Sequence, residues 1–205
     1  MHADLFKGYS EALLVEEDIS KIDIKEGMLV MYLLKPISYF WKKFFEELPA
    51  KLLQATYGLL FCLVAIAFLG KNIFTFSHDF SIILLCLLLL AGAMLLSFTL
   101  KMILGILTFW FIDIQGLYEM IYLIEVIFSG ILMPIVLMPT QIAHIAYILP
   151  FAYIVYSPIS VLQGHVSLVE IFPILFIQCI WLLIGFLVYQ TLWMLGIKKF
   201  SGVGQ

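Results

Sequence analysis

The sequence predicts an all-α membrane protein with about four transmembrane helices. Of its 205 residues, 64% are hydrophobic and 12% are charged, whereas soluble domains are about 45–50% apolar and about 25% charged. The mean hydropathy is +1.12. Apolar runs of span length also alternate with short polar segments, which is the pattern of helices that cross a hydrocarbon core about 30 Å thick.

The composition excludes several other classes of protein. The net charge is −3, and all eleven basic residues are lysines, so the bidentate phosphate clamps of arginine are absent and nucleic acid is not an expected partner. The cysteines Cys62, Cys86 and Cys179 lie inside apolar runs without C-x-x-C spacing. We interpret them as small buried hydrophobic side chains. We expect no cleavable signal peptide, because residues 1–20 combine five acidic residues with no apolar core.

The amino-terminal region, residues 1–36, is predicted to be cytoplasmic. Residues 9–22 have apolar side chains every three to four positions, which favours an amphipathic helix. Gly27 interrupts this pattern, and the next apolar run, residues 28–34, is too short to span a bilayer. We expect that run to end before Pro36, because the residue preceding a proline avoids helical geometry.

Residues 37–48 are predicted to form a second amphipathic helix that lies in the membrane interface. The alternative is a helix that packs on a soluble partner, but a membrane span follows at once and favours the interface. One face is aromatic and aliphatic and the other is charged: Ile37, Phe40, Trp41, Phe44, Phe45 and Leu48 oppose Lys42, Lys43, Glu46 and Glu47.

The transmembrane domain is predicted to occupy residues 49–205. Pro49 suits the first turn of its first helix. The second apolar run would be about 48 Å long as a helix, so we expect it to protrude on one side of the membrane. Spans are predicted near residues 50–70, 80–111, 117–138 and 171–196.

Prolines and a glycine interrupt the apolar sequence after the third run begins. A straight helix over residues 117–138 is therefore not expected, and the chain should kink or stop there. Residues 140–164 contain interleaved tyrosines, which prefer the headgroup level, and we interpret them as an outer re-entrant helical hairpin. The candidate helix breaks are Gly130, Pro134, Pro139, Pro150 and Pro158.

The distribution of lysines predicts the orientation of the chain. Positive residues favour the cytoplasmic side, which places both termini in the cytoplasm. The first and last spans are flanked by Lys35, Lys42, Lys43, Lys51, Lys198 and Lys199, whereas the predicted outer segments contain only Lys71.

No catalytic or metal site is predicted. The sequence contains no G-x-S-x-G, H-E-x-x-H or Walker-type glycine loop. His144 and His165 have no carboxylate neighbours in sequence, so we interpret them as interfacial histidines. ATP, if it drives this protein, must then bind to another chain, and no cofactor is expected in this one.

Two charges inside the spans are predicted to approach each other. Lys101 lies about 15 Å from the turn that follows Phe111, and Glu125 lies about 14 Å beyond the other end of that turn. Intramembrane charges face the interior of a helix bundle, so the pair is a candidate polar element beside a transport path. A structural pair, or a Lys101 that reaches the interface, are the alternatives. Glu119 is interpreted as an acid at a helix start.

Four motifs follow one another in order along the chain. The first is I-K-E-G-M-L-V-M-Y-L-L-K-P-I-S-Y at residues 24–39, and Phe109-Trp110 closes the second span. Ser129-Gly130 is followed by Pro134 and Pro139, and L-P-F-A-Y-I-V-Y-S-P occupies residues 149–158. Over roughly residues 10–205, this ordered set resembles bacterial type 2 ATP-binding-cassette export permeases, whose patterns are I-x-x-G-x-L-x-x-Y-L-L-K/R-P-x-S-Y, S-G-x-x-x-P…P and L-P-F-x-Y-x-x-Y-x-P.

The resemblance implies a six-span permease that dimerises and binds a cytoplasmic ATPase through a coupling helix. Residues 9–36 match that coupling region, so its candidate contacts are Ile22, Lys25, Gly27 and Leu29. The four spans would be the third to sixth of the family. Two spans would then precede residue 9, and we expect a truncated product or a partial chain that another polypeptide completes.

We therefore predict a permease subunit of an ATP-driven exporter in the bacterial plasma membrane. Its expected partners are a cytoplasmic ATP-binding-cassette ATPase, a second permease chain in a homodimer or heterodimer, and membrane lipid. The alternative is a non-transporting assembly or scaffold subunit that docks a cytoplasmic partner through residues 9–48. An intramembrane enzyme is disfavoured, because the spans lack a polar constellation.

Overall fold

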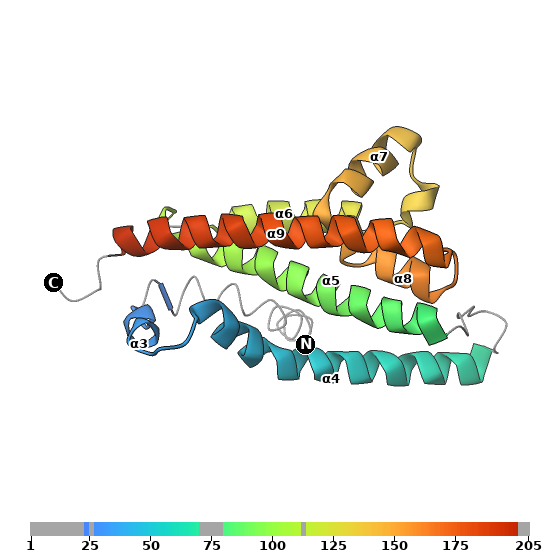
Figure 1. Cartoon of the computed structure of the whole chain (residues 1–205), viewed down its shortest axis with the longest axis horizontal. Helices are drawn as coiled ribbons and strands as arrows, with labels where there is room; N and C mark the ends of the chain where they lie inside the picture. Colours follow the sequence, from blue (N-terminus) through green and yellow to red (C-terminus); the bar gives the residue numbers. More distant parts are fainter. Residues whose placement is uncertain (1–22, 25–26, 70–79, 112–113, 201–205) are drawn as a thin grey trace, which may run out of the picture. The chain divides into compact units, whose positions relative to one another are not determined.

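The computed structural model describes residues 23–24, 27–69, 80–111 and 114–200. These residues form helices and connecting turns and contain no strand, which confirms the all-α fold class (Figure 1). In order, the elements are α3 (Leu29–Leu33), α4 (Tyr39–Leu69), α5 (Phe80–Ile106), η4 (Leu107–Phe109), α6 (Gln115–Phe128), η5 (Ile135–Leu137), α7 (Thr140–Ile148), η6 (Pro150–Tyr153), α8 (Tyr156–Leu162) and α9 (Leu168–Lys199).

Three helices of the described chain are long and apolar enough to cross a membrane. They are Tyr39–Phe68, Phe80–Phe109 and Leu168–Lys199. A fourth crossing is available only if the pair Thr140–Ile148 and Pro150–Leu162, bent by 74°, forms one broken span. The same bend is compatible with the re-entrant hairpin that the sequence predicts over residues 140–164.

Helix α4 is one helix of 31 residues where the sequence predicts two. Pro49 lies inside it, although proline removes a backbone hydrogen bond and crowds the preceding turn. One charged pair a turn apart precedes Pro49, with Lys42 Nζ 3.2 Å from Glu46 Oε1, and another spans it, with Lys51 Nζ 3.3 Å from Glu47 Oε1. The predicted interfacial segment and the first predicted span are thus continuous in the structure.

The third predicted span is interrupted, and the helix there is short. Helix α6 has 14 residues and ends at Phe128, which gives about 21 Å, too short for a hydrocarbon core of about 30 Å. Gly130 follows with φ of +85°, a backbone conformation that glycine adopts without steric penalty. The physical reason for the short helix is therefore local, because the chain turns sharply at this glycine.

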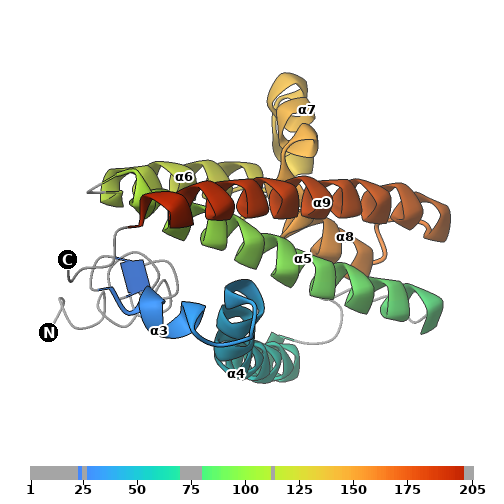
Figure 2. The same cartoon turned by 60° about the vertical axis from the view of Figure 1, so that its left-hand side comes forward.

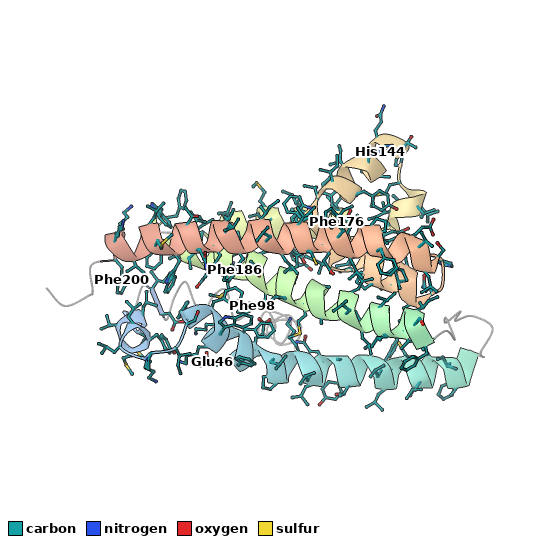
Figure 3. All side chains as sticks on the ribbon, viewed as in Figure 1. Glu46, Phe98, His144, Phe176, Phe186 and Phe200 are labelled. Carbon is teal, nitrogen blue, oxygen red and sulfur yellow. The ribbon has the colours of Figure 1, made fainter. Side chains whose placement is uncertain are left out.

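The described chain divides into two compact units, which we describe separately. The first unit takes its residues from Met1–Ala55, Phe98–Gln115 and Phe186–Gln205. Phe40, only 2% exposed, is the centre of its aromatic core. Its ring contacts Phe98 and Tyr189, each with a centroid distance of 5.0 Å, and Phe186 at 5.6 Å; Phe98 and Phe186 are labelled in Figure 3. The edge-to-face geometry of these rings is the favourable one for aromatic pairs.

The second unit comprises Thr56–Ser97 and Gly116–Gly185. Helix α7 projects away from α8 and from the part of α9 in this unit, and both views show it (Figure 2). One buried cluster joins α5 to the short helices, and it consists of Leu96, Ile135, Met138, Ala146, Ala152 and Tyr153. A second joins α5, α8 and α9 and consists of Ile82, Cys86, Leu89, Val161 and Ile171.

Candidate functional site

A buried charged cluster fixes the segment before α3 to the start of α4. Asp23 is 1% exposed, and its carboxylate lies 2.5 Å from the ammonium group of Lys43. The hydroxyl of Tyr39 donates a second hydrogen bond of 2.6 Å to the same oxygen, Oδ2. We call these three residues the Asp23 cluster. A buried carboxylate is tolerated only when it is paired and hydrogen-bonded, and here both conditions are met.

Lys42 contributes a weaker, more exposed contact next to this cluster. Its ammonium group lies 3.5 Å from the ring centroid of Tyr32, which is a cation–π geometry. It also pairs with the more exposed Glu46. The two successive lysines therefore differ in role: Lys43 is buried against Asp23, and Lys42 lies over the ring that α3 supplies.

The predicted coupling residues lie in the same short segment. Gly27 has φ of +79°, and its carbonyl accepts a hydrogen bond from the amide of Val30 as α3 begins. Leu29, at the start of α3, is fully buried. Ile22 and Lys25 lie outside the described residues. Of the residues named in the amino-terminal segment, the structure therefore describes Asp23, Gly27 and Leu29.

A second charged cluster in the first unit joins α4 to α5. Glu47 Oε1 lies 3.7 Å from the ammonium group of Lys101 and 3.3 Å from that of Lys51. We call these residues the Glu47 cluster. The pairing of Lys101 with Glu47 was not foreseen from the sequence. The predicted approach of Lys101 to Glu125 stays a prediction.

In the second unit, side chains cap backbone carbonyls where the helices break. Trp181 donates from Nε1 to the carbonyl of Ile148 at 3.2 Å, and the Tyr153 hydroxyl donates to the carbonyl of Tyr147 at 2.8 Å. Both carbonyls belong to the last turn of α7, where backbone carbonyls have no partner within the helix. A carbonyl without a hydrogen bond would be costly in lipid, because lipid offers no donors.

Gln178 provides the most buried of these caps. Its amide Nε2 donates to the carbonyl of Leu89 at 3.0 Å and to that of Tyr153 at 3.1 Å, and the residue is 1% exposed. Gly92 makes room for it, since a Cβ at that position would lie 2.5 Å from Gln178 Oε1. This glutamine therefore links α5, α9 and η6 through two backbone carbonyls.

The predicted helix breaks occupy different positions around these caps. Gly130 follows α6, Pro134 precedes η5, Pro139 precedes α7, and Pro150 begins η6. Pro158 instead lies within the first turn of α8, where a backbone N–H has no helical partner and its loss is cheap. The amide of Tyr156 donates to the carbonyl of Ser129 at 3.1 Å, so the start of α8 is fastened to the chain just after α6.

The two predicted interfacial histidines lie in the second unit. His144 is exposed on α7 and is labelled in Figure 3. His165 helps to line a cavity of about 350 Å³ whose other polar lining groups are Tyr147, Tyr153, Tyr156, Ser157 and Ser160. Among the described residues, no three His, Cys, Asp or Glu side chains are grouped to hold a metal ion.

Sequence reasoning missed Asp23, Glu47 and Gln178, for different reasons. Gln178 carried a usable signal, since an amide in an otherwise apolar span has to find a partner. Glu47 carried a weaker signal, because the sequence pattern places it on the charged face of an amphipathic helix. Asp23 lies among many acidic residues, and nothing in the local pattern distinguishes it.

Comparison with known proteins finds a family whose model matches this chain. The model of a family described as "ABC-2 family transporter protein" matches residues 12–204. No curated protein and no solved structure matches the chain. The match covers the Asp23 cluster, the Glu47 cluster and the carbonyl caps of the second unit.

Proposed function

The chain belongs to the ABC-2 family of transporter proteins, and we propose that it is the permease subunit of an ATP-driven exporter in the bacterial plasma membrane. Proteins of this family are membrane components that work with a cytoplasmic ATPase. We assign ATP binding and hydrolysis to that partner, because the sequence contains no glycine-rich phosphate loop. A second permease chain, identical or different, completes the path.

One observation carries the coupling part of this proposal. The carboxylate of Asp23 joins the amino-terminal segment to α4 by an ion pair to Lys43 and a hydrogen bond from Tyr39. Helix α4 is among the helices long enough to cross the membrane. An ATPase that binds residues 9–36 and moves them would therefore pull on this helix through the Asp23 cluster.

The distribution of charge supports the proposed orientation. Lys198 and Lys199 lie in the last turn of α9, and the lysines of α4 lie toward its amino-terminal end. Positive residues favour the cytoplasmic side, so both termini are assigned to the cytoplasm. This orientation requires an even number of crossings, so it takes the bent pair Thr140–Ile148 and Pro150–Leu162 as the fourth one. A green fluorescent protein fused after Gln205 should fluoresce, and a periplasmic alkaline phosphatase fused there should be inactive; the opposite pattern would reverse the orientation.

The function is tested by co-expressing the chain with its candidate ATPase. We expect the two to copurify and ATP hydrolysis to rise when the permease is present. Lys25→Glu should abolish copurification if this residue contacts the ATPase, while Lys198→Glu, a matched charge reversal elsewhere, should not. Copurification with hydrolysis that does not depend on the permease would support the scaffold alternative instead.

A further inference from the structure

A pocket of about 260 Å³ in the first unit is not used by the coupling mechanism. It lies between the turn that joins α3 to α4 and the last part of α9. Its lining combines side chains from α3, from this turn, from the start of α4 and from α9. Residues of the motif L-L-K-P-I-S-Y, at positions 33–39, form one side of the pocket. Of the residues in this motif, only Tyr39 has a part in the proposed coupling.

The inner wall of this pocket is aromatic and well packed. Tyr39, Phe40 and Tyr189 are each no more than 6% exposed. Trp193 stacks on Tyr39 with a centroid distance of 4.7 Å and on Tyr189 at 6.0 Å. The wall is therefore an aromatic surface whose rings pack against one another, which favours a ligand with an apolar part.

The mouth of the pocket carries a cation and neutral hydrogen-bonding groups. Lys35, Ser38 and Gln190 are exposed and line it, and its lining contains no carboxylate. Within the described part of the chain, Lys35 forms no ion pair, whereas four other lysines of this unit do: Lys42, Lys43, Lys51 and Lys101. The charge at the mouth is thus available to an anionic group.

The surface beside the pocket is apolar, which suits contact with lipid. Leu34 is 81% exposed and Ile37 is 59% exposed on either side of Lys35. A cation flanked by apolar side chains and backed by tyrosine and tryptophan is the combination found at the membrane interface. A basic pocket between helices at that level suits the headgroup of an acidic lipid.

We propose that this pocket binds the headgroup of an anionic phospholipid, with Lys35 contacting the phosphate. The hydroxyl of Ser38 and the amide of Gln190 hydrogen-bond to the headgroup, and the acyl chains lie along Leu34 and Ile37. The site goes beyond the transport function: it would make the end of α9 and the α3–α4 turn sensitive to the lipid composition of the leaflet.

Fluorescence quenching tests this site, because Trp193 is part of its wall. The chain is reconstituted in nanodiscs that contain brominated phosphatidylglycerol or, at equal bromine content, brominated phosphatidylcholine. The contribution of Trp193 is the difference between the protein and its Trp193→Phe variant. We expect stronger quenching of Trp193 by phosphatidylglycerol, with an apparent preference of about fivefold.

Matched variants distinguish a built site from diffuse attraction. Lys35→Gln should abolish the preference, Lys35→Arg should retain it, and Lys198→Gln, which removes the same charge outside the pocket, should leave it intact. Gln190→Phe, which fills the exposed mouth without changing charge, should also abolish it. Equal quenching by the two lipids, or equal losses in Lys35→Gln and Lys198→Gln, would overturn the proposal.

Discussion

Both units of this protein contain buried polar groups, but the two units pair these groups with different kinds of partner. The first unit uses charges: Asp23 with Lys43, and Glu47 with Lys51 and Lys101. The second uses neutral donors on backbone carbonyls, chiefly from Gln178 and Trp181. The difference teaches which partner each buried group requires, since a buried charge needs an opposite charge, whereas a backbone carbonyl at a helix break needs only a neutral donor.

The difference also separates two kinds of mechanical link. An ion pair between two side chains joins the segments that carry them, as the Asp23 cluster joins the amino-terminal segment to α4. A side chain bonded to carbonyls holds a break in a fixed shape, as Gln178 does for η6. Under the proposed function, the first unit would transmit motion from the ATPase, and the second would maintain the shape of its helix breaks.

The largest expected effect is the loss of one partner of the buried ion pair. Lys43→Met should lower the free energy of unfolding by about 3 kcal/mol, because the carboxylate of Asp23 is left buried without its ion pair. Lys42→Met on the same helix should cost no more than about 1 kcal/mol, because its ion pair is more exposed. Unfolding in detergent, followed by circular dichroism, measures both; similar losses would erase the distinction between these lysines.

An intermediate effect is expected at Gln178. Replacing it by leucine removes two hydrogen bonds to carbonyls and should cost about 1–3 kcal/mol, whereas Gln190→Leu, on an exposed face of the same helix, should cost less than about 0.5 kcal/mol. Gly92→Ala should destabilise the native protein, since its Cβ would lie 2.5 Å from Gln178 Oε1.

The same pair of sites offers an internal check by a double-mutant cycle. Gly92→Ala should be nearly neutral in a Gln178→Ala background, because the clashing amide is gone. Additive losses in the double variant would show that the two residues do not contact each other. The free energies come from the same unfolding measurement.

The smallest expected effect is at the turn after α6. Gly130→Ala should cost about 1–2 kcal/mol, since an L-residue at φ of +85° is strained and its Cβ would lie 3.2 Å from that of Tyr156. Gly116→Ala, with open space around it in α6, should instead be neutral or stabilise by about 0.5–1 kcal/mol. A stabilised Gly130→Ala variant would mean that the turn is not maintained in solution.

The sequence predicts the helical class well and the boundaries of individual helices less well. Hydropathy alone locates the apolar runs that become α5 and α9. The prediction of a helix start at Pro49 was wrong, because α4 continues through Pro49, and an ion pair between Glu47 and Lys51 spans that position. The short α6 could be anticipated from Gly130, whose conformational freedom is a local property of the chain.

The functional contacts were harder to predict because their partners are distant in sequence. Gln178 reaches the carbonyl of Leu89, 89 positions away, and backbone acceptors leave no signature in the sequence. Asp23 and Lys43 are 20 positions apart, across a glycine turn and a short helix. Such pairs are fixed by packing, which hydropathy and spacing do not describe.

The most direct test of the account is whether the Asp23–Lys43 pair couples the ATPase to the membrane helices. ATP hydrolysis by the candidate ATPase is measured in nanodiscs with the wild-type chain, Lys43→Met, the exchanged pair Asp23→Lys with Lys43→Asp, and Lys42→Met as control. We predict that Lys43→Met still copurifies with the ATPase but loses stimulation by about fivefold or more, that the exchanged pair regains it, and that Lys42→Met resembles wild type. Full stimulation by a folded Lys43→Met protein would contradict the account.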